Sequence, residues 1–242
     1  MTEPMKPRRS WLIVPAHDPD TVPYRDVAPD VIVLDLEYTV PPRCKDSARA
    51  GLEALVKSIG NSDAELFVRI DRDARWADAA AAVQRGVRGI VFPGPDEADE
   101  VRELAELITA KEKERGVEPG TIELALMLES AKGFWNAAEL AKASERVTAV
   151  GVGRIDLTMQ LGPVPQDEFR LQRFLLTRAV VAARMLAKQP LGAFWRPGSR
   201  GGVASRDTTE KAAREGRLMG FSGCLCATPE QVAPVNAAFG AA

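Results

Sequence analysis

Eight short apolar runs, separated by segments with helical periodicity, restrict the fold of this 242-residue chain more than any other feature. The runs are rich in Val, Ile, Leu and Phe and are too short for helices, as expected of strands buried on both faces. Such alternation predicts a parallel sheet with helical crossovers. The runs are Trp11–Val14, Val31–Leu36, Leu66–Ile70, Gly89–Phe92, Ile122–Leu128, Val147–Val152, Leu191–Trp195 and Phe221–Cys226.

The segments between these runs carry apolar or small residues at helical spacing. Asp18–Ala28 is the least regular of them, because Pro19 and Pro23 interrupt it. The other expected helices are Asp46–Ile59, Asp73–Gln84, Asp96–Arg115, Lys132–Ala143, Asp167–Lys188, Asp207–Met219 and Pro229–Phe239. Acidic or hydroxyl residues at several starts are expected N-caps, namely Asp46, Asp73, Asp96 and Thr228.

Eight strand–helix repeats in a chain of this length predict a closed (β/α)8 barrel, or TIM barrel. We expect one such domain over residues 1–242, with no linker inside it. An open doubly wound sheet is the alternative, but no Gly-x-Gly-x-x-Gly turn follows the first run. The barrel is therefore the favoured fold.

The composition argues against several classes of protein. The 32 basic and 34 acidic residues give a net charge of −2, which does not favour nucleic-acid binding. Three cysteines without a regular spacing argue against a disulfide scaffold and favour a reducing compartment. The first nine residues lack an apolar signal segment, and no run approaches the roughly 20 apolar residues that span a bilayer. We expect a cytoplasmic protein without a membrane partner.

Charged residues follow several of the expected strands. Asp35 and Glu37 lie at the end of the second run, Arg69 lies at the end of the third, Glu129 follows the fifth and Asp156 follows the sixth. In a (β/α)8 barrel the active site lies at the carboxyl ends of the strands. The sequence therefore predicts that four carboxylates and one arginine converge on one face.

Crowded carboxylates repel one another unless a cation or protons neutralise them. Oxygen ligands suit Mg²⁺ or Mn²⁺, and we expect Glu129 and Asp156 to bind the metal. Arg69 could hold a substrate carboxylate by two parallel hydrogen bonds. A 2-oxo or 2-hydroxy acid chelating the metal would then have its enolate stabilised. Asp35 and Glu37 are further catalytic candidates, although any of these groups could instead cap a helix or form a structural ion pair.

Three further features have open roles. His17 is the only histidine, so a metal cluster or a Ser–His triad has no second one to use, and it belongs either to the site or to loop structure. Cys224 and Cys226 share one face of a run and are expected to be buried thiols, since no second pair completes a zinc site. A Gly-rich stretch near Arg196, Arg200 and Arg206 could contact a phosphate or be a solvated loop.

Six segments, in order between residues 8 and 239, resemble citrate lyase β-subunit-like proteins of the HpcH/HpaI aldolase/citrate lyase family. The first reads Arg-Ser-Trp-Leu-Ile-Val-Pro, and the fourth reads Leu-Glu-Ser-Ala-Lys-Gly. In chain order the segments are Arg9–Pro15, Val33–Lys45, Val68–Ile70, Leu128–Gly133, Gly153–Leu157 and Gly220–Asn236.

The resemblance implies a Mg²⁺-dependent barrel, often a homotrimer, that makes or breaks carbon–carbon bonds. Its substrates would be 3-hydroxyacyl-CoA thioesters such as citryl-, malyl- or citramalyl-CoA, or small carboxylates. By the same resemblance, Glu129 and Asp156 would bind the metal, and Arg69 would hold the substrate carboxylate. Arg9 would lie near a phosphate of coenzyme A. Larger relatives carry a C-terminal lid domain, and we expect none in residues 1–242.

Four positions depart from the family pattern while the expected metal ligands and Arg69 remain. Tyr38, Gly94, Ile155 and Thr228 stand where the family usually has Asp, Lys, Glu and His. The loss of such supporting groups can cost ten- to a hundredfold in metal affinity or activity. Three functions therefore stay open: a metal-dependent lyase or aldolase, a CoA thioesterase that uses the same pocket, and a diverged barrel subunit without catalysis.

Overall fold

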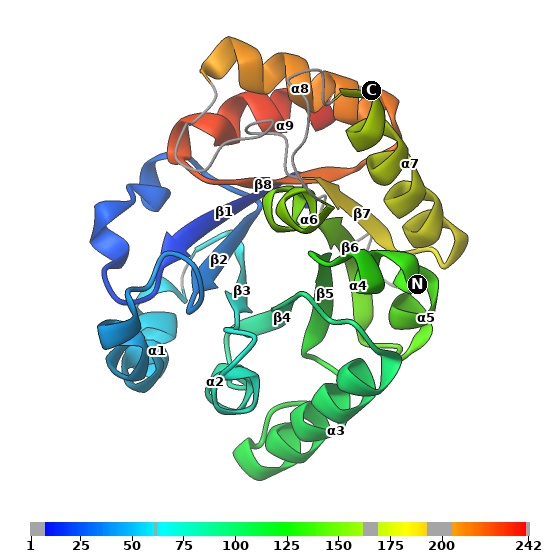
Figure 1. The fold of residues 1–242 in the computed structure, drawn as a ribbon. Coiled ribbons are helices and arrows are strands. Elements are labelled where there is room, and N and C mark those ends of the chain that lie inside the picture. Colours follow the sequence, from blue (N-terminus) through cyan, green and yellow to red (C-terminus); the bar gives the residue numbers. More distant parts are fainter. Residues whose placement is uncertain (1–7, 61, 162–168, 193–204, 241–242) are drawn as a thin grey trace, which may run out of the picture.

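The computed structural model describes residues 8–60, 62–161, 169–192 and 205–240. Its strands pair in parallel in chain order, and β8 pairs back with β1, so that the sheet closes (Figure 1). The predicted (β/α)8 barrel is confirmed. The strands are β1 (Ser10–Pro15), β2 (Val31–Asp35), β3 (Glu65–Arg69), β4 (Val87–Pro93), β5 (Glu123–Leu128), β6 (Val147–Val152), β7 (Gln189–Gly192) and β8 (Gly223–Cys226).

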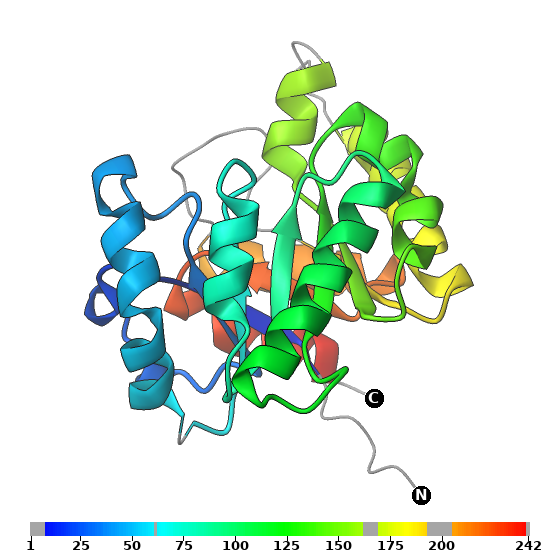
Figure 2. The same cartoon turned by 90° about the horizontal axis from the view of Figure 1, so that it is seen from below.

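The helices lie around the outside of the barrel, except α6, which projects from one end of it (Figure 2). The helices are α1 (Lys45–Ile59), α2 (Arg75–Ala82), α3 (Ala98–Arg115), α4 (Ala131–Trp135), α5 (Ala137–Lys142), α6 (Arg154–Leu161), α7 (Phe169–Met185), α8 (Arg206–Leu218) and α9 (Val232–Gly240). Short 3-10 helices are η1 (Pro19–Thr21), η2 (Tyr24–Asp26), η3 (Pro42–Cys44) and η4 (Pro229–Gln231).

Several expected helices differ in detail. The segment Asp18–Ala28 forms only η1 and η2, since prolines interrupt it. The expected helix Lys132–Ala143 is divided at Asn136, and α6 was not expected at all. Thr228 is confirmed as an N-cap, that of η4.

The acidic residues expected as N-caps of the first three regular helices do not have that role. The N-cap positions of α1, α2 and α3 are Cys44, Ala74 and Glu97. The carboxylates of Asp46 and Asp96 form ion pairs with arginines instead.

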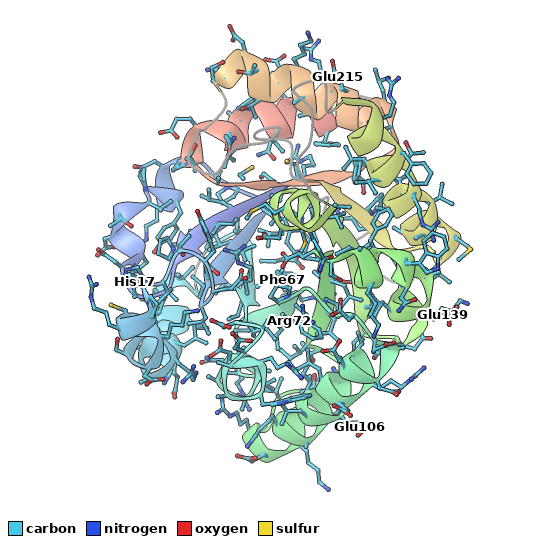
Figure 3. The ribbon with its side chains drawn as sticks, viewed as in Figure 1. His17, Phe67, Arg72, Glu106, Glu139 and Glu215 are labelled. Atoms are coloured by element: carbon cyan, nitrogen blue, oxygen red, sulfur yellow. The ribbon has the colours of Figure 1, made fainter. Side chains whose placement is uncertain are left out.

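The barrel interior is filled by side chains that point inward from the strands (Figure 3). Among them, the rings of Trp11 and Phe67 pack against each other at an interplanar angle of 55°, with centroids 4.6 Å apart. Phe67 covers Gly89, where a Cβ atom would lie 2.3 Å from the ring. A second apolar layer, which includes the buried thiols of Cys224 and Cys226 as expected, joins the barrel to its helices. In the described parts of the chain, every helix is too short or too polar to span a membrane.

A buried ion-pair network closes the amino end of the barrel. Arg8 donates to Glu65 and to Glu123, the latter with an Nη1–Oε2 distance of 2.5 Å. Thr148 donates to the same Glu123 oxygen at 2.7 Å. The guanidinium of Arg8 also stacks over the ring of Phe67, 5.2 Å from its centroid. Arg8 and Glu123 are thus buried as a charge pair at the amino end of the barrel.

Glu112 of α3 is fully buried and connects this helix to the starts of two strands. Its carboxylate accepts hydrogen bonds from the backbone of Gly120 and Ile122, both at 3.0 Å. Arg146 donates to both of its oxygens, at 2.9 and 2.6 Å. Burial by itself raises the pKa of Glu112, but the hydrogen bonds from Arg146 and the backbone outweigh it and hold the pKa below its usual value.

We expect Glu112→Gln to lower the free energy of unfolding at pH 7 by about 3 to 5 kcal/mol, because Arg146 loses its partner inside the protein. The stabilisation is complete above the usual glutamate pKa of about 4.3 and is lost as the pH falls through the lower folded-state value. The difference between wild type and variant in urea unfolding should therefore narrow below pH 4. Glu114→Gln, which removes an exposed pair with Lys111, is the control and should change little. Equal stability of wild type and Glu112→Gln at pH 7 would contradict the assignment.

Candidate active site

The carboxyl ends of neighbouring strands bring the expected site residues together. Asp35 and Arg69 are the last residues of β2 and β3 and are paired in register. Glu129 directly follows β5, and Asp156 lies in the first turn of α6, just after β6. The pKa of Glu129 responds to the charges of Glu37, Arg69 and Asp156, so these groups share one electrostatic environment.

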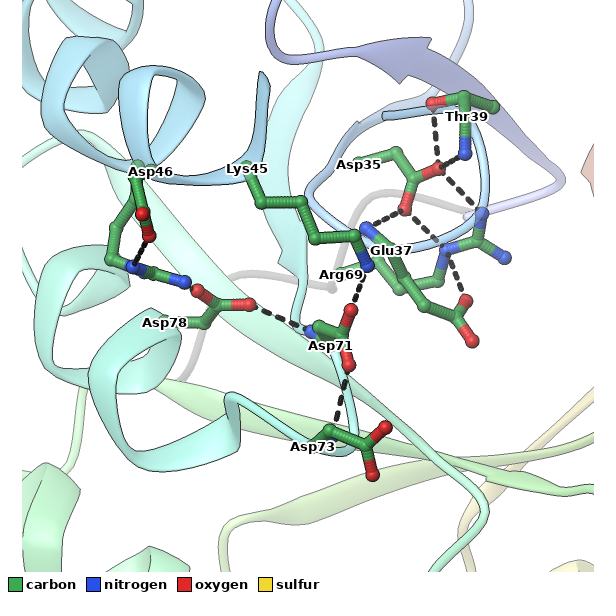
Figure 4. A network of polar contacts seen from close by, with 10 residues as sticks. Asp35, Glu37, Thr39, Lys45, Asp46, Arg69, Asp71, Asp73 and Asp78 are labelled. Carbon is green, nitrogen blue, oxygen red and sulfur yellow. Dashed lines mark hydrogen bonds and ion pairs between the residues drawn. The ribbon is translucent and has the colours of Figure 1, made fainter. Parts of the chain in front are cut away.

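Asp35 is a fully buried carboxylate that holds Arg69. The Nε and Nη2 atoms of Arg69 each donate to one oxygen of Asp35 at 2.7 Å (Figure 4). The backbone N–H groups of Glu37 and Thr39 donate to the same carboxylate at 2.9 and 2.7 Å. Burial by itself raises the pKa of Asp35, but the charge of Arg69 and these hydrogen bonds outweigh it and hold the pKa below its usual value. Asp35 therefore lies beneath Arg69 as an ionised anchor.

Arg69 presents only one of its two edges to the pocket. Its Nε–Nη2 edge faces Asp35, and its Nε also lies 3.3 Å from Oε2 of Glu37. The side chain is 12% exposed. A guanidinium carries five N–H donors in a planar fork, so the Nη1–Nη2 edge can still bind a carboxylate by two hydrogen bonds.

Glu129 is a carboxyl group with a strongly shifted pKa. Burial and the neighbouring charges of Glu37 and Asp156 raise its pKa to about 8, against the opposing effect of Arg69. Burial also raises the pKa of Glu37. Gly153, which follows β6, leaves room for Glu129: a Cβ atom there would lie 2.3 Å from Cγ of Glu129. The site therefore concentrates negative charge that a cation would relieve.

The donor set of Glu129 and Asp156 fits a hard divalent cation. Both groups offer carboxylate oxygens, the ligands that Mg²⁺ and Mn²⁺ prefer. Among the described residues, no group of three His, Cys, Asp or Glu side chains is arranged to hold a metal by itself. Mg²⁺ commonly takes one or two protein carboxylates and completes its shell with water and substrate oxygens. Two protein ligands would leave positions open for a substrate.

Two groups of residues around the pocket were not predicted. In the first, Lys45 at the start of α1 pairs with Asp71, whose Oδ1 accepts from the backbone N–H of Asp73 at 2.8 Å (Figure 4). Asp78 joins this group by accepting from the backbone N–H of Asp71 at 2.8 Å. The charge of Lys45 lowers the pKa of Glu37 against the larger effect of burial. Lys45 lies inside the segment Val33–Lys45 that resembles the family. That resemblance is the one sequence feature that could have indicated a place for Lys45 near the pocket.

The second group is formed by Arg72, Asp96 and Ser130. Nη2 of Arg72 donates to Oδ2 of Asp96 at 2.7 Å, and the hydroxyl of Ser130 donates to Oδ1. Ser130 also caps α4 by accepting from the backbone N–H of Gly133 at 2.9 Å. No sequence pattern indicated this group, because its members are far apart in the chain.

Arg9 does not join the other expected site residues. It lies at the amino end of β1, and both Nε and Nη2 donate to Asp30 at 2.8 Å. The pocket formed by Glu129 and Arg69 is at the opposite ends of the strands, so Arg9 lies outside that pocket, and its expected position near a phosphate of coenzyme A stays a prediction. Nδ1 of His17 is buried without a hydrogen-bond partner among the described residues, and the role of His17 stays open.

The remaining candidates are only partly described. Tyr38 follows β2 and is 66% exposed. Asp156 is exposed on α6, whereas the side chain of its neighbour Ile155 lies outside the described residues. Arg196 and Arg200 also lie outside them, and Arg206 is exposed at the start of α8.

Comparison with known proteins gives consistent matches over most of the chain. A model of the family described as HpcH/HpaI aldolase/citrate lyase matches residues 9–229. Citrate lyase subunit beta of Leuconostoc mesenteroides subsp. cremoris is 31% identical over 245 residues, covering 95% of this chain and 76% of that protein. L-malyl-CoA/beta-methylmalyl-CoA lyase of Haloarcula marismortui is 30% identical over 152 residues, covering 56% of this chain and 43% of that protein.

A solved structure supports the same fold. The citrate lyase beta subunit from M. tuberculosis, in complex with oxaloacetate and magnesium, superimposes with a TM-score of 0.74 at 24% sequence identity. The match covers 96% of this chain and 97% of that chain.

We expect Gly153→Ala to weaken Mg²⁺ binding at least about tenfold, because the new methyl group would displace the side chain of Glu129. Gly51→Ala is the control, since a Cβ atom at that position of α1 meets no other atom within 4 Å. Calorimetric titration with Mg²⁺, together with thermal unfolding of each variant, measures both properties. Unchanged Mg²⁺ affinity in a folded Gly153→Ala protein would show that Glu129 does not bind the metal.

Proposed function

The chain belongs to the HpcH/HpaI aldolase/citrate lyase family, and on this premise we propose that it is a carbon–carbon lyase that depends on Mg²⁺ or Mn²⁺. The proposed substrate is a carboxylate-bearing 3-hydroxyacyl-CoA thioester or a 2-oxo or 2-hydroxy acid. The observation that carries the proposal is the convergence of Glu129, Asp156, Glu37 and Arg69 at the carboxyl ends of the strands. The two lyases compared above act on compounds of this class by name.

The proposed reaction breaks the bond between C2 and C3 of the substrate. A base takes the proton of the 3-hydroxyl group, the bond breaks, and its electron pair remains on the acyl fragment as an enolate, which then takes up a proton. The other fragment leaves as an oxo acid. A divalent cation held by Glu129 and Asp156 would supply positive charge to oxygens on which negative charge develops.

The protein's own residues have separate tasks in this proposal. Arg69 binds the carboxylate of the oxo-acid fragment through its Nη1–Nη2 edge, and Asp35 holds Arg69 in that orientation. Glu37 lies beside Arg69, and burial raises its pKa above the ordinary value, which makes it a stronger base than an exposed glutamate. Asp35 is therefore a positioning residue, and Glu37 is the proposed proton carrier.

Thr228, one of the residues that depart from the family pattern, has a structural role that is compatible with catalysis. Thr228, at the position where the family usually has His, is the N-cap of η4. Gln231 accepts hydrogen bonds from the backbone N–H groups of Ala227 and Thr228, at 2.7 and 3.2 Å, and closes this turn. The turn thus remains fixed without the histidine.

We expect wild-type protein to bind Mg²⁺ in calorimetry and to bind oxaloacetate or pyruvate only when Mg²⁺ is present. Asp156→Asn should lose both, because the cation loses one of its two protein ligands. Product analysis with acetyl-CoA and candidate CoA thioesters then separates the possible reactions. Fragments of a cleaved carbon chain support the lyase, and free CoA with an intact acid indicates a thioesterase. No metal uptake under any condition would favour a barrel subunit without catalysis.

We expect Mg²⁺ binding at pH 7 to release a proton. The pKa of Glu129 is raised to about 8 in the metal-free protein, so most of its carboxyl groups carry a proton at pH 7 that a cation must displace. The apparent Mg²⁺ affinity should therefore rise as the pH increases to about 8 and level off above it. Calorimetry in buffers of different ionisation enthalpy counts the protons released. In Glu129→Gln the residual binding should release none, and an unchanged proton release in this variant would disprove the assignment.

A further inference from the structure

A second guanidinium, that of Arg72, lies beside Glu129 of the pocket. The space above Gly94 is shared by Arg72 and Glu129: a Cβ atom built on Gly94 would lie 3.1 Å from Nη1 of Arg72 and 3.6 Å from Oε2 of Glu129. Gly94 has a φ of +56°, a conformation that other residues adopt only with strain. Glycine at this position therefore provides both the backbone conformation and the room for Arg72.

Arg72 is held in place by groups that do not belong to the proposed chemistry. Its Nη2 donates to Asp96 at 2.7 Å, and Asp96 is itself bound by Ser130 at the N-cap of α4. Arg75 donates to the backbone carbonyl of Arg72 at 3.2 Å. The side chain of Arg72 nevertheless remains 41% exposed. A guanidinium that is fixed on one side and open to solvent on the other is well suited to bind a ligand.

The charges around this space restrict the kind of ligand. The carboxyl groups of Glu37, Glu129 and Asp156 line the pocket, and a bound cation would be balanced by the carboxylates that hold it, so an anionic substrate needs positive partners for each of its charges. The proposed cation and Arg69 together suffice for one chelating carboxylate. A second carboxylate on the same molecule would need another cationic group, and Arg72 is available beside Glu129.

We propose that Arg72 binds a second anionic group of the substrate, so that the site selects dicarboxylates over monocarboxylates, and that Gly94 is required for Arg72 to reach it. This inference rests on the proposed function, because it assigns a ligand contact in the same metal-dependent pocket. An alternative role for Arg72 is to compensate the charge of Glu129, whose pKa it lowers against the larger effect of burial. In that role, Arg72 would affect the binding of dicarboxylates and monocarboxylates equally.

The test compares two stable 2-hydroxy acids, malate with two carboxylates and lactate with one, titrated into Mg²⁺-loaded protein. Wild type should bind malate more tightly than lactate. Arg72→Gln should weaken malate binding by roughly tenfold or more, as expected for loss of a charged hydrogen bond, and change lactate binding by less than about twofold. Arg72→Lys should recover part of the preference.

Two further variants separate this effect from a general loss of structure or charge. Gly94→Ala keeps Arg72 but crowds its guanidinium. Like Arg72→Gln, it should reduce the preference for malate over lactate. Arg102→Gln removes the same charge from an exposed pair with Asp99 on α3, and it should leave the preference unchanged. Thermal unfolding confirms that each variant is folded.

The outcomes distinguish this inference from the function on which it rests. If wild type binds Mg²⁺ but shows no preference for malate, or if Arg72→Gln weakens malate and lactate binding equally, the role of Arg72 is wrong and the metal site stands. If wild type binds no Mg²⁺, the proposed function fails, and this inference fails with it.

Discussion

The ion pair between Asp35 and Arg69 is the interaction on which the rest of the pocket depends. It joins the last residues of two paired strands, and the loop that follows β2 folds back over it through Glu37 and Thr39. Because the pair is buried, removal of one partner would leave an uncompensated charge, at a cost of about 3 to 5 kcal/mol. The pair also fixes which edge of Arg69 faces the pocket. Asp35, which we propose takes no part in the chemistry, thus determines the direction from which a carboxylate can approach Arg69.

Two glycines shape this pocket, because a side chain at either position would need space that neighbouring site residues occupy. Gly153 leaves the space that the side chain of Glu129 occupies, and Gly94 leaves the space beside it that Arg72 enters. Both glycines directly follow strands, where a Cβ atom would point toward the shared space. A carboxyl group enclosed in this way loses much of its hydration, which raises its pKa and makes a neutralising cation more favourable.

Most of the fold was predictable from the sequence because strands of a parallel barrel are buried on both faces and so form continuous apolar runs. The convergence of Glu129, Asp156 and Arg69 followed from the rule that strand ends meet on one face. The helix α6 was missed, because a helix of only eight residues has no long apolar period. The group around Arg72 was missed as well, since Asp96 lies 24 residues further along the chain and meets Arg72 only when β4 pairs with β3. Arg9 lies at the amino end of β1, as its position before a strand predicts, and its expected position near a phosphate of coenzyme A stays a prediction.

The position of Arg72 also gives a physical meaning to one departure from the family pattern. Related sequences usually have a lysine where this chain has Gly94, and a bare glycine would remove a positive charge beside Glu129. In the structure a guanidinium from the loop after β3 occupies the space that any side chain at Gly94 would need. In our proposal, the planar guanidinium of Arg72, held by Asp96, supplies the positive charge that a lysine at position 94 would give. The two groups differ in how they bind anions, because a guanidinium can bind a carboxylate through two parallel hydrogen bonds, whereas an ammonium acts as a point charge. Under the proposed role of Arg72, glycine at position 94 would change the geometry of anion recognition while a positive charge is kept beside Glu129.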